Sequence, residues 1–352
     1  MKASKAAHLL DRVAIFKQSE ACPWNGCGTI TTDGTILLAA WYTGGYKEPH
    51  PENRVVLSRS FDRGGTWSPP TIVSDPEGDL RAGDPMAWQD GENTTHFTWG
   101  HHDHYKATGD WTYFHMRCDD LSAEQLEWTE AKPITPESID FMLNNKTIPL
   151  RNGGYLSPIA IRTGNRKLSP YHEGFTRAGA LLTLDRGQTW RLIGQTPDMP
   201  RSGYGPSDIT LWEPGVIETE DGTLRFYVRN SWGLIHTSYS SDGGKTWSDW
   251  EPTNMPNPSS RFHIRKIPEG PVICLNNPNS LMGSMPDRKQ RSPLAIHISY
   301  DEGVSFARIV ILDPRVGMYP DAALDPDGHT LHIFYENRID VFYAALDLNE
   351  IL

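Results

Sequence analysis

The stretch WGHHDHYKATGDW (residues 99–111) concentrates side chains that can move protons or bind a metal ion. His101 or His102 can serve as the base of a β-elimination, in which a tyrosine is the acid and an arginine neutralises a uronate carboxylate. The spacing of the histidines is also compatible with metal binding. Because no neighbouring set of Cys, His and Asp residues completes a metal site, we expect a function that needs neither metal nor cofactor.

Further charged and aromatic side chains lie in segments that are far apart in the sequence. They are Glu48, Glu52, Arg54, Asp84, Glu213, Arg229, Arg261, Arg291, Tyr319 and Asp321. A fold that brings these segments to one face would line a single pocket with arginine, tyrosine, glutamate and histidine. The chain must therefore be examined for elements that place distant loops together.

An eight-residue motif recurs along the chain and sets the spacing of such elements. Its copies are SFDRGGTW (60–67), TLDRGQTW (183–190), SSDGGKTW (240–247) and the looser SYDEGVSF (299–306). If Trp128 closes a degraded copy, the final aromatic residue recurs about every 60 residues. The repeat predicts a series of similar units rather than two unrelated domains, and we expect a single domain over residues 1–352.

Turn dipeptides mark a second position in each unit. They are Asp33-Gly34, Asp90-Gly91, Asn152-Gly153, Asp221-Gly222, Glu269-Gly270 and Asp327-Gly328. Each stands between apolar runs, and such pairs favour hairpin turns with positive φ. Units of four short strands repeated six times predict an all-β fold, a six-bladed β-propeller. The segment RVAIFK (12–17) alternates as a strand does, and we expect it to close the ring as the outer strand of the last blade.

The motif itself has a structural role in this scheme. We expect it to form the turn between the third and fourth strands, where the Asp carboxylate accepts hydrogen bonds from its own turn. The glycine supplies an unusual φ, and the closing aromatic covers the seam between neighbouring sheets. The motif aspartates are therefore not expected to be catalytic.

Composition limits the possible partners. The net charge is −11, which argues against nucleic acid because phosphate binding needs a basic surface. No apolar run is long enough to span a bilayer, and the start of the chain has no apolar core of the signal-peptide type. We expect a cytoplasmic protein, or a secreted or periplasmic one if a signal was removed. Cys22 and Cys27 are close enough to pair, although buried free thiols are the favoured interpretation. The oligomeric state is left open.

The repeated octet resembles the Asp-box, or BNR repeat, of sialidases and related propellers, whose signature is Ser-x-Asp-x-Gly-x-Thr-Trp. Two copies, at 60–67 and 240–247, fit it fully, and the resemblance covers nearly the whole chain. It implies the propeller fold strongly. It implies activity less directly, because Asp-boxes also occur in proteins with other functions.

Three further stretches resemble sialidase segments. WEPGVIETEDGTLRFYVRN (212–230) corresponds to a segment with a glutamate and a carboxylate-binding arginine, here Glu213 and Arg229. A second segment, RSPLAIHISYDEG (291–303), resembles the one that carries another carboxylate-binding arginine, here Arg291. A third, GMYPDAALDPDG (317–328), resembles the one that carries the nucleophilic tyrosine, here Tyr319. The resemblance implies that the arginines hold a substrate carboxylate, while Glu213 accepts the phenolic proton of Tyr319.

Two features depart from the sialidase pattern. The first inner strand, CPWNGCGTITTDG (22–34), has Asn25 and no arginine where sialidases have Arg-Ile-Pro. The following loop, GGYKEPHPENR, lacks the usual acid/base Asp and offers Glu48 and Glu52 in its place. Arg54 is a candidate for the third positive charge. Asp84 and His102 are further candidates for substrate contacts.

The resemblance implies a sialidase-like exo-glycoside hydrolase that acts on a terminal sugar bearing a carboxylate. Its partner would be an acidic oligosaccharide or glycoconjugate. Two alternatives stay open. One is a lyase that cleaves a uronate-containing glycan with His101 and a tyrosine, and the other is a propeller that binds glycans without catalysis.

Overall fold

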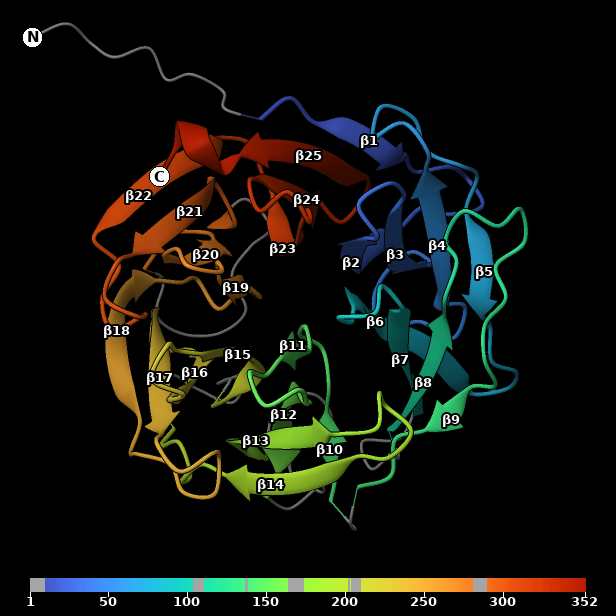
Figure 1. Cartoon of the computed structure of the whole chain (residues 1–352). Helices are drawn as coiled ribbons and strands as arrows, with labels where there is room; N and C mark the ends of the chain where they lie inside the picture. The colour runs from blue at the N-terminus through green and yellow to red at the C-terminus, as the bar shows by residue number, and fades with distance from the viewer. Residues whose placement is uncertain are drawn as a thin grey trace, which may run out of the picture.

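Six small sheets stand side by side around a central axis in the computed structural model (Figure 1). The structure describes residues 10–103, 111–136, 139–163, 174–201, 203, 210–280 and 290–352. Almost all the regular structure of the described residues is β-strand, and a short 3-10 helix, η2 (Leu348–Glu350), lies near the end of the chain. The predicted all-β, six-bladed propeller is confirmed.

The blades follow one another along the chain. Blade 1 consists of β2 (Asn25–Thr32), β3 (Leu37–Thr43), β4 (Arg54–Ser60) and β5 (Thr71–Ser74). Blade 2 consists of β6 (Leu80–Gln89), β7 (Thr95–Asp103), β8 (Thr112–Cys118) and β9 (Lys132–Pro133). Blade 3 consists of β10 (Phe141–Met142), β11 (Ile148–Pro149), β12 (Tyr155–Arg162), β13 (Phe175–Thr183) and β14 (Arg191–Gln195).

The second half of the ring has the same plan. Blade 4 consists of β15 (Trp212–Glu218), β16 (Leu224–Arg229), β17 (Leu234–Ser240) and β18 (Glu251–Pro256). Blade 5 consists of β19 (His263–Lys266), β20 (Val272–Asn276), β21 (Leu294–Ser299) and β22 (Arg308–Asp313). Blade 6 consists of β23 (Met318–Leu324), β24 (Thr330–Glu336), β25 (Val341–Asp347) and β1 (Val13–Phe16).

The first strand of the chain closes the ring. Strand β1 pairs antiparallel with β25, with Val13 opposite Tyr343 and Ala14 opposite Phe342. The last blade therefore obtains its outer strand from the beginning of the chain, as the sequence predicted. The core lies within and between the sheets, where middle strands such as β3 (LLAAWYT) are buried along their full length. Such strands are continuous apolar runs because each sheet is covered on both faces by its neighbours.

The Asp-box turns connect the third and fourth strands, as expected. In blade 1, Asp62 accepts hydrogen bonds from the backbone N–H of Thr66 at 2.8 Å and from its hydroxyl at 2.7 Å. Ser60 donates to the same carboxylate, and these bonds lower the pKa of Asp62 to about 2. The other boxes repeat this pattern at Asp185, Asp242 and Asp301.

Aromatic residues of the boxes cover the seams between blades. Trp67 packs on Tyr343 of blade 6 with ring centroids 5.5 Å apart, and Phe306 packs on Tyr227 of blade 4 at 6.1 Å. Trp247 instead stacks on Phe226 of its own blade. The degraded copy that ends at Trp128 also lies between the third and fourth strands of its blade. The boxes are thus structural in their contacts.

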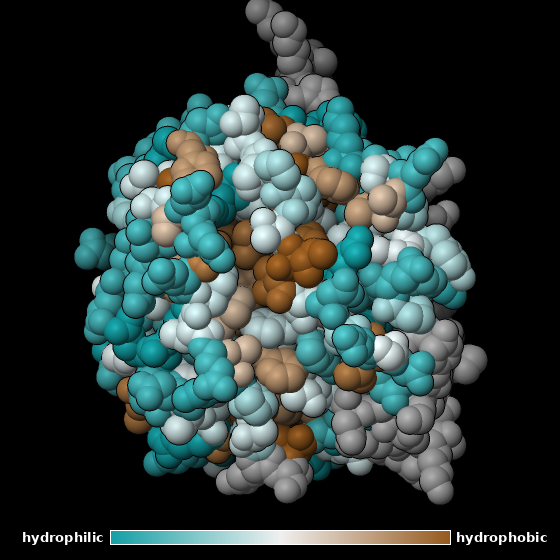
Figure 2. Space-filling model, turned by 90° about the vertical axis from the view of Figure 1, so that its right-hand side faces the viewer, coloured by the Kyte–Doolittle hydropathy of each residue, from teal (hydrophilic) through white to brown (hydrophobic). Residues whose placement is uncertain are grey.

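One flank of the ring is mostly polar. Figure 2 shows the flank on which β5 and β9 lie in Figure 1, where small brown patches interrupt a largely teal surface. All four cysteines are free thiols, in line with the favoured interpretation. No helix in the described part of the chain is long and apolar enough to span a membrane.

Two details differ from the expected strand limits. Strand β7 continues to Asp103, so His101 and His102 belong to a strand and not to the predicted loop 99–111. The inner edge of blade 3 is split into β10 and β11, each of which pairs with β12. Residues 104–110 of the stretch 99–111 lie outside the described residues.

Candidate active site

A bulge near the start of four innermost strands turns selected side chains toward the axis. The strand register shifts between Gly26 and Thr29, Gly83 and Met86, Trp212 and Gly215, and Met318 and Asp321. In each bulge one residue that is not glycine has positive φ: Cys27 (49°), Asp84 (51°), Glu213 (46°) and Tyr319 (50°). Such conformations cost of order 1–3 kcal/mol each and cluster at functional sites. The equivalent bulges therefore indicate where the fold presents its chemistry.

These four residues share one cavity of about 260 Å³ on the axis. The residues that line it are Cys27, Glu48, Pro49, Arg81, Asp84, His102, Trp111, Met142, Asn144, Trp212, Glu213, Arg229, Tyr319 and Arg338. They come from blades 1, 2, 3, 4 and 6 and from the segments that enter them. The ring thus brings together residues that are up to about 300 positions apart, which is the convergence that the loop composition predicted.

Guanidinium groups surround Tyr319. The Cζ atom of Arg291 lies 4.7 Å from the centroid of the tyrosine ring, and those of Arg229 and Arg338 lie at 5.8 and 5.9 Å. Arg338 also donates from Nη2 to the phenolic oxygen at 3.4 Å. Arg261 lies over the same ring but donates to the main-chain oxygens of Gly28 and Tyr319, so it braces the strands.

Glu213 and Arg229 form a buried ion pair beside the tyrosine. Nη1 of Arg229 donates to Oε2 of Glu213 at 2.7 Å, and both side chains are less than a tenth exposed. Burial lowers the pKa of the guanidinium, but its interactions with Glu213 and Tyr319 outweigh burial and raise that pKa above its ordinary value. Separating the two groups would leave each buried charge without a partner, which is strongly destabilising. The pair therefore keeps both side chains in fixed positions.

Asp84 is a carboxyl group that holds its proton near neutral pH. Burial, and the nearby charge of Glu48, raise its pKa to about 7. The hydroxyl of Tyr113 donates to Oδ2 at 3.4 Å, and Nε2 of His102 lies 3.4 Å from the same oxygen. Burial keeps the pKa of His102 well below its ordinary value, so this histidine is neutral.

At the start of β2, a carboxyl group from blade 6 occupies the space beside Gly26. A Cβ atom at Gly26 would lie 2.5 Å from Oε2 of Glu336, so this carboxyl group occupies the space that a side chain needs. Glu336 accepts a short hydrogen bond from the N–H of Cys27, and burial raises its pKa to about 8. Two residues later in the chain, Arg338 brings a guanidinium to the pocket from blade 6. The pocket thus receives a guanidinium from blade 6, while the described start of β2 provides none.

Four predicted site residues lie outside the cavity lining, and one of them, Arg291, still lies over the ring of Tyr319. Nε2 of His101 lies 2.7 Å from the hydroxyl of Ser74, between blades 2 and 1. Arg54 pairs at 3.6 Å with Asp75, away from the axis. Asn25 is fully buried, and its amide bonds to the main chain of Cys22 and Ile339. The predicted residues Glu48, Asp84, His102, Glu213, Arg229 and Tyr319 do line the cavity.

Sequence reasoning missed three groups at or beside the cavity: Arg81, Glu336 and Arg338. A signal existed in the dipeptides Asp84-Pro85, Glu213-Pro214 and Tyr319-Pro320, which mark three of the four bulges. No comparable signal marks Arg338, because its approach to Tyr319 depends on the packing of blade 6 against the axis.

The electrostatic balance of the site is positive. Five guanidiniums, of Arg81, Arg229, Arg261, Arg291 and Arg338, face four carboxyl groups, of Glu48, Asp84, Glu213 and Glu336. The raised pKa values of Asp84 and Glu336 leave these two largely or partly protonated at pH 7. The site is therefore suited to an anion, although the whole chain is acidic. Among the described residues, no group of three or more His, Cys, Asp or Glu residues is arranged to hold a metal ion.

The sequence matches one protein family over most of its length. The family described as BNR repeat-like domain matches residues 34–333. A sialidase of Micromonospora viridifaciens is 26% identical over 349 residues, which cover 91% of this chain and 50% of the relative. The chain thus spans about half the length of this curated relative.

Solved structures share the fold. A Hadza microbial sialidase has a TM-score of 0.72 at 18% identity, covering 94% of this chain and 66% of the other. A protein of unknown function from Dyadobacter fermentans has a TM-score of 0.73 at 15% identity, with 96% and 99% covered. The intramolecular trans-sialidase of Ruminococcus gnavus, solved with oseltamivir carboxylate, has a TM-score of 0.71 at 13% identity, with 99% of both chains covered. At these identities the likeness concerns the fold.

Proposed function

Since the chain belongs to the family of BNR repeat-like domains, we propose that it is a glycoside hydrolase of the sialidase type, which removes a terminal acidic sugar from a glycan. One observation carries the proposal. The ring of Tyr319 lies within 6 Å of the guanidiniums of Arg229, Arg291 and Arg338, in a cavity that Glu213 also lines.

The arginines supply the binding energy and the orientation. Three guanidiniums around one ring can hold a carboxylate by charge-assisted hydrogen bonds, and this places the adjacent anomeric carbon above the phenol. A tyrosine nucleophile suits such a carbon because it is neutral before attack and is not repelled by the sugar carboxylate. A carboxylate nucleophile in the same position would be repelled.

The first chemical step forms a bond between the phenolic oxygen of Tyr319 and the anomeric carbon, while the bond to the leaving oxygen breaks. The phenolic proton passes to Glu213, whose carboxylate the bond from Arg229 holds in place. The leaving oxygen receives a proton from Asp84, which the raised pKa of about 7 keeps available. Glu48 lines the same wall and keeps that proton on Asp84 by charge repulsion.

The second step reverses these transfers. Asp84, now ionised, accepts a proton from a water molecule as the water oxygen attacks the anomeric carbon. The bond to Tyr319 breaks, and its oxygen recovers a proton from Glu213. Two successive displacements on one carbon give a product of retained configuration.

The decisive test replaces Tyr319 with Phe, which removes only a hydroxyl group. Turnover of an aryl glycoside of sialic acid should fall by about a thousandfold or more, because the nucleophile is lost. Tyr46→Phe is the matched control, since the Tyr46 side chain is 70% exposed and lies outside the cavity. Thermal unfolding should be similar for both variants. Activity retained by the Tyr319 variant would refute the proposed nucleophile.

The same assay separates the alternatives. A lyase would release an unsaturated uronate that absorbs ultraviolet light, whereas a hydrolase would release a saturated sugar. The position of His101 outside the cavity removes one candidate base of the lyase reaction. A propeller that only binds glycans would retain ligand but convert neither sialosides nor uronate glycans.

A further inference from the structure

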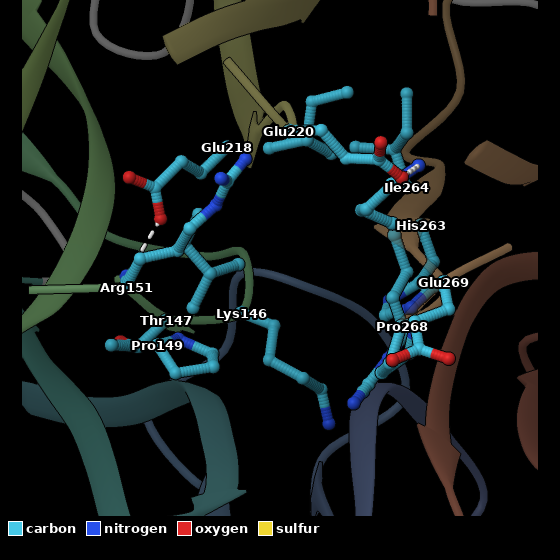
Figure 3. Close-up of a pocket in the computed structure, with 14 residues that line it drawn as sticks. Lys146, Thr147, Pro149, Arg151, Glu218, Glu220, His263, Ile264, Pro268 and Glu269 are labelled. Atoms are coloured by element: carbon cyan, nitrogen blue, oxygen red, sulfur yellow. Dashed lines mark hydrogen bonds and ion pairs between the residues drawn. The ribbon is translucent and has the colours of Figure 1, made fainter. Parts of the chain in front are cut away.

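Residues 144–146 lie between two cavities near the central axis. Asn144 lines the catalytic cavity, which reaches the start of β15, and Lys146 lines a second cavity of about 290 Å³, which reaches the end of that strand. Figure 3 shows this second cavity, in which the side chain of Lys146 extends away from Arg151 and Glu218. Lys146 is only 8% exposed although it borders this space. A charge buried to this extent needs partners within the protein.

The ammonium group of Lys146 has three protons and contacts three acceptors, each from a different blade. Nζ donates to the main-chain oxygen of Ile30 in blade 1 at 2.5 Å and to that of Ala87 in blade 2 at 2.9 Å. It also lies 2.8 Å from Oδ2 of Asp321 in blade 6. Because Lys146 itself precedes β11 of blade 3, one side chain joins four of the six blades.

Each of the three acceptors lies just after a bulge that aims a side chain at the catalytic cavity. Asp321 comes two residues after Tyr319. Ala87 comes three residues after Asp84, and Ile30 follows the bulge of β2 in the same way. The ammonium group thus ties the strand of the proposed nucleophile to the strand of the proposed proton donor, across the axis.

The neighbouring residue contacts the fourth bulge. Nδ2 of Asn145 donates to the main-chain oxygen of Glu213 at 3.4 Å, and to that of Phe262, just before β19, at the same distance. Oδ1 of Asn145 accepts a bond of 3.0 Å from the N–H of Lys146, which orients the amide. Residues 145 and 146 together therefore contact the strands of all four bulges.

The carboxylate of Asp321 has several donors. Besides Lys146 they are the hydroxyl of Thr29 at 2.6 Å, the N–H of Ile30 at 2.9 Å and Nδ1 of His263 at 3.0 Å. Burial opposes the ionisation of Asp321, but the charge of Lys146 and the bond from His263 outweigh burial and lower its pKa. Additional hydrogen bonds of this kind are what a buried ion pair needs to offset the loss of water.

We propose that Lys146 is a positioning residue of the hydrolase. It sets the distance between the phenolic oxygen of Tyr319 and the carboxyl group of Asp84, which must reach the anomeric carbon and its leaving oxygen at the same time. The catalytic consequence rests on the proposed function, whereas the placement of the two side chains can be measured without turnover.

The kinetic test uses Lys146→Met, which keeps a long unbranched side chain and removes the three donors. The kcat for an aryl glycoside of sialic acid should fall by about 10- to 100-fold, because a displacement of about 1 Å has effects of this size. The kcat for a sialoside with an alkyl leaving group should fall at least about threefold further, since this substrate also needs the proton of Asp84. A mere loss of folded protein would lower both rates by the same factor.

Lys266→Met is the matched control. Lys266 lines the same second cavity and pairs with Glu220 at 3.2 Å and with Glu302 at 2.5 Å. These partners lie in turns of blades 4 and 5 and not beside a bulge, so both rates and their ratio should stay unchanged.

A second variant is needed if Lys146→Met does not fold, because that change leaves Asp321 as a buried charge without its cation. Lys146→Met combined with Asp321→Asn removes both charges together and should fold, as exchange of a whole buried pair is tolerated better than loss of one partner. The same two rates and the same ratio are then measured on this double variant.

Crystal structures of the folded variants test the placement itself. The distance between the phenolic oxygen of Tyr319 and the carboxyl group of Asp84 should change by about 1 Å without Lys146, and should stay the same in Lys266→Met. The proposal is overturned if this distance is unchanged, or if the ratio of the two rates equals that of the unaltered protein. If the unaltered protein converts no sialoside, the hydrolase proposal fails instead, and the crystallographic distance alone decides whether Lys146 positions the two side chains.

Discussion

At the scale of single residues, we expect Arg338 to compensate for the absence of an arginine at the start of β2. Gly26 leaves room for the carboxyl group of Glu336, and Arg338 takes the place of the guanidinium that blade 1 does not provide. The electrostatic interaction with Tyr319 raises the pKa of Arg338 further above its ordinary range. The anion site is thus kept positive, but its third cation approaches from blade 6 rather than blade 1.

Arg338→Gln tests this compensation. The variant should lower kcat/KM for an acidic sugar substrate by about 10- to 150-fold, which corresponds to the loss of one charge-assisted hydrogen bond. A neutral analogue of the substrate should be much less affected. Arg54→Gln is the control, because Arg54 lies away from the cavity and should have little influence on either substrate. The idea fails if the Arg54 variant shows the larger loss.

Asp84→Asn tests the proposed proton donor through the pH profile. In the unaltered protein kcat/KM should fall as the pH rises above about 7, because Asp84 loses its proton there. The variant should lose activity on glycosides with poor leaving groups far more than on those with an activated phenol. A profile that keeps the same fall above pH 7 in the variant would assign the proton to another group.

The same carboxyl group links stability to pH. The pKa of Asp84 is about 7 in the folded chain and about 4 in an unfolded one, so between these values the unfolded chain binds fewer protons. Its contribution to the free energy of unfolding must therefore fall as the pH rises from about 4 to 7 and then stay constant. Urea unfolding measures this effect: from pH 5 to pH 8, the free energy of unfolding should fall less for the Asp84→Asn variant than for the unaltered protein.

At the scale of elements, two local devices serve different ends. The Asp-box turns are stabilised by bonds within eight residues, so they recur wherever the motif recurs. The bulges at the starts of β2, β6, β15 and β23 break the pairing instead and aim one side chain each at the axis. The Asp-box turns thus stabilise the blades, whereas the bulges position the side chains of the candidate active site.

Asp185→Ala tests the contribution of a box. Asp185 accepts bonds from the N–H and hydroxyl of Thr189 and from the hydroxyl of Thr183. Their loss should lower the free energy of unfolding by about 1–3 kcal/mol, with kcat unchanged. Asp249→Ala is the control, since Asp249 is an exposed residue just after the box at residues 240–247. Equal unfolding midpoints in urea for the two variants would contradict the structural role.

At the scale of the whole molecule, stability depends on closing the ring. The side chain of Ile15 in β1 is 7% exposed and packs in the cluster that contains Trp41 and Val341. Strand β1 joins the two ends of the chain within one sheet. Its loss would expose the edge of β25 and loosen the blade that carries Tyr319.

Ile15→Ala should lower the free energy of unfolding by about 2–4 kcal/mol, which is the usual range for removing a buried isoleucine side chain. Lys17→Ala, at an exposed position just after the strand, should have little effect. Chemical denaturation followed by tryptophan fluorescence measures both. If the two variants unfold alike, β1 does not hold the ring together.

The sequence by itself determined the number of blades, the turns and the closing strand. These features depend on hydrogen bonds and apolar periods within a few residues, and they repeat, so each copy supports the others. It also determined that Glu213, Arg229 and Tyr319 belong to segments that converge, because the repeat places their strands at equivalent positions.

Only the tertiary structure decided which side chains reach the axis. His101 and His102 are neighbours in the sequence, yet His102 lines the cavity while His101 faces Ser74, because alternate residues of a strand point to opposite sides. Arg338 lies over the ring of Tyr319, whereas Arg54, the predicted third cation, pairs with Asp75 outside the cavity lining. Such choices depend on the packing of one blade against the next, and no local pattern contains that information.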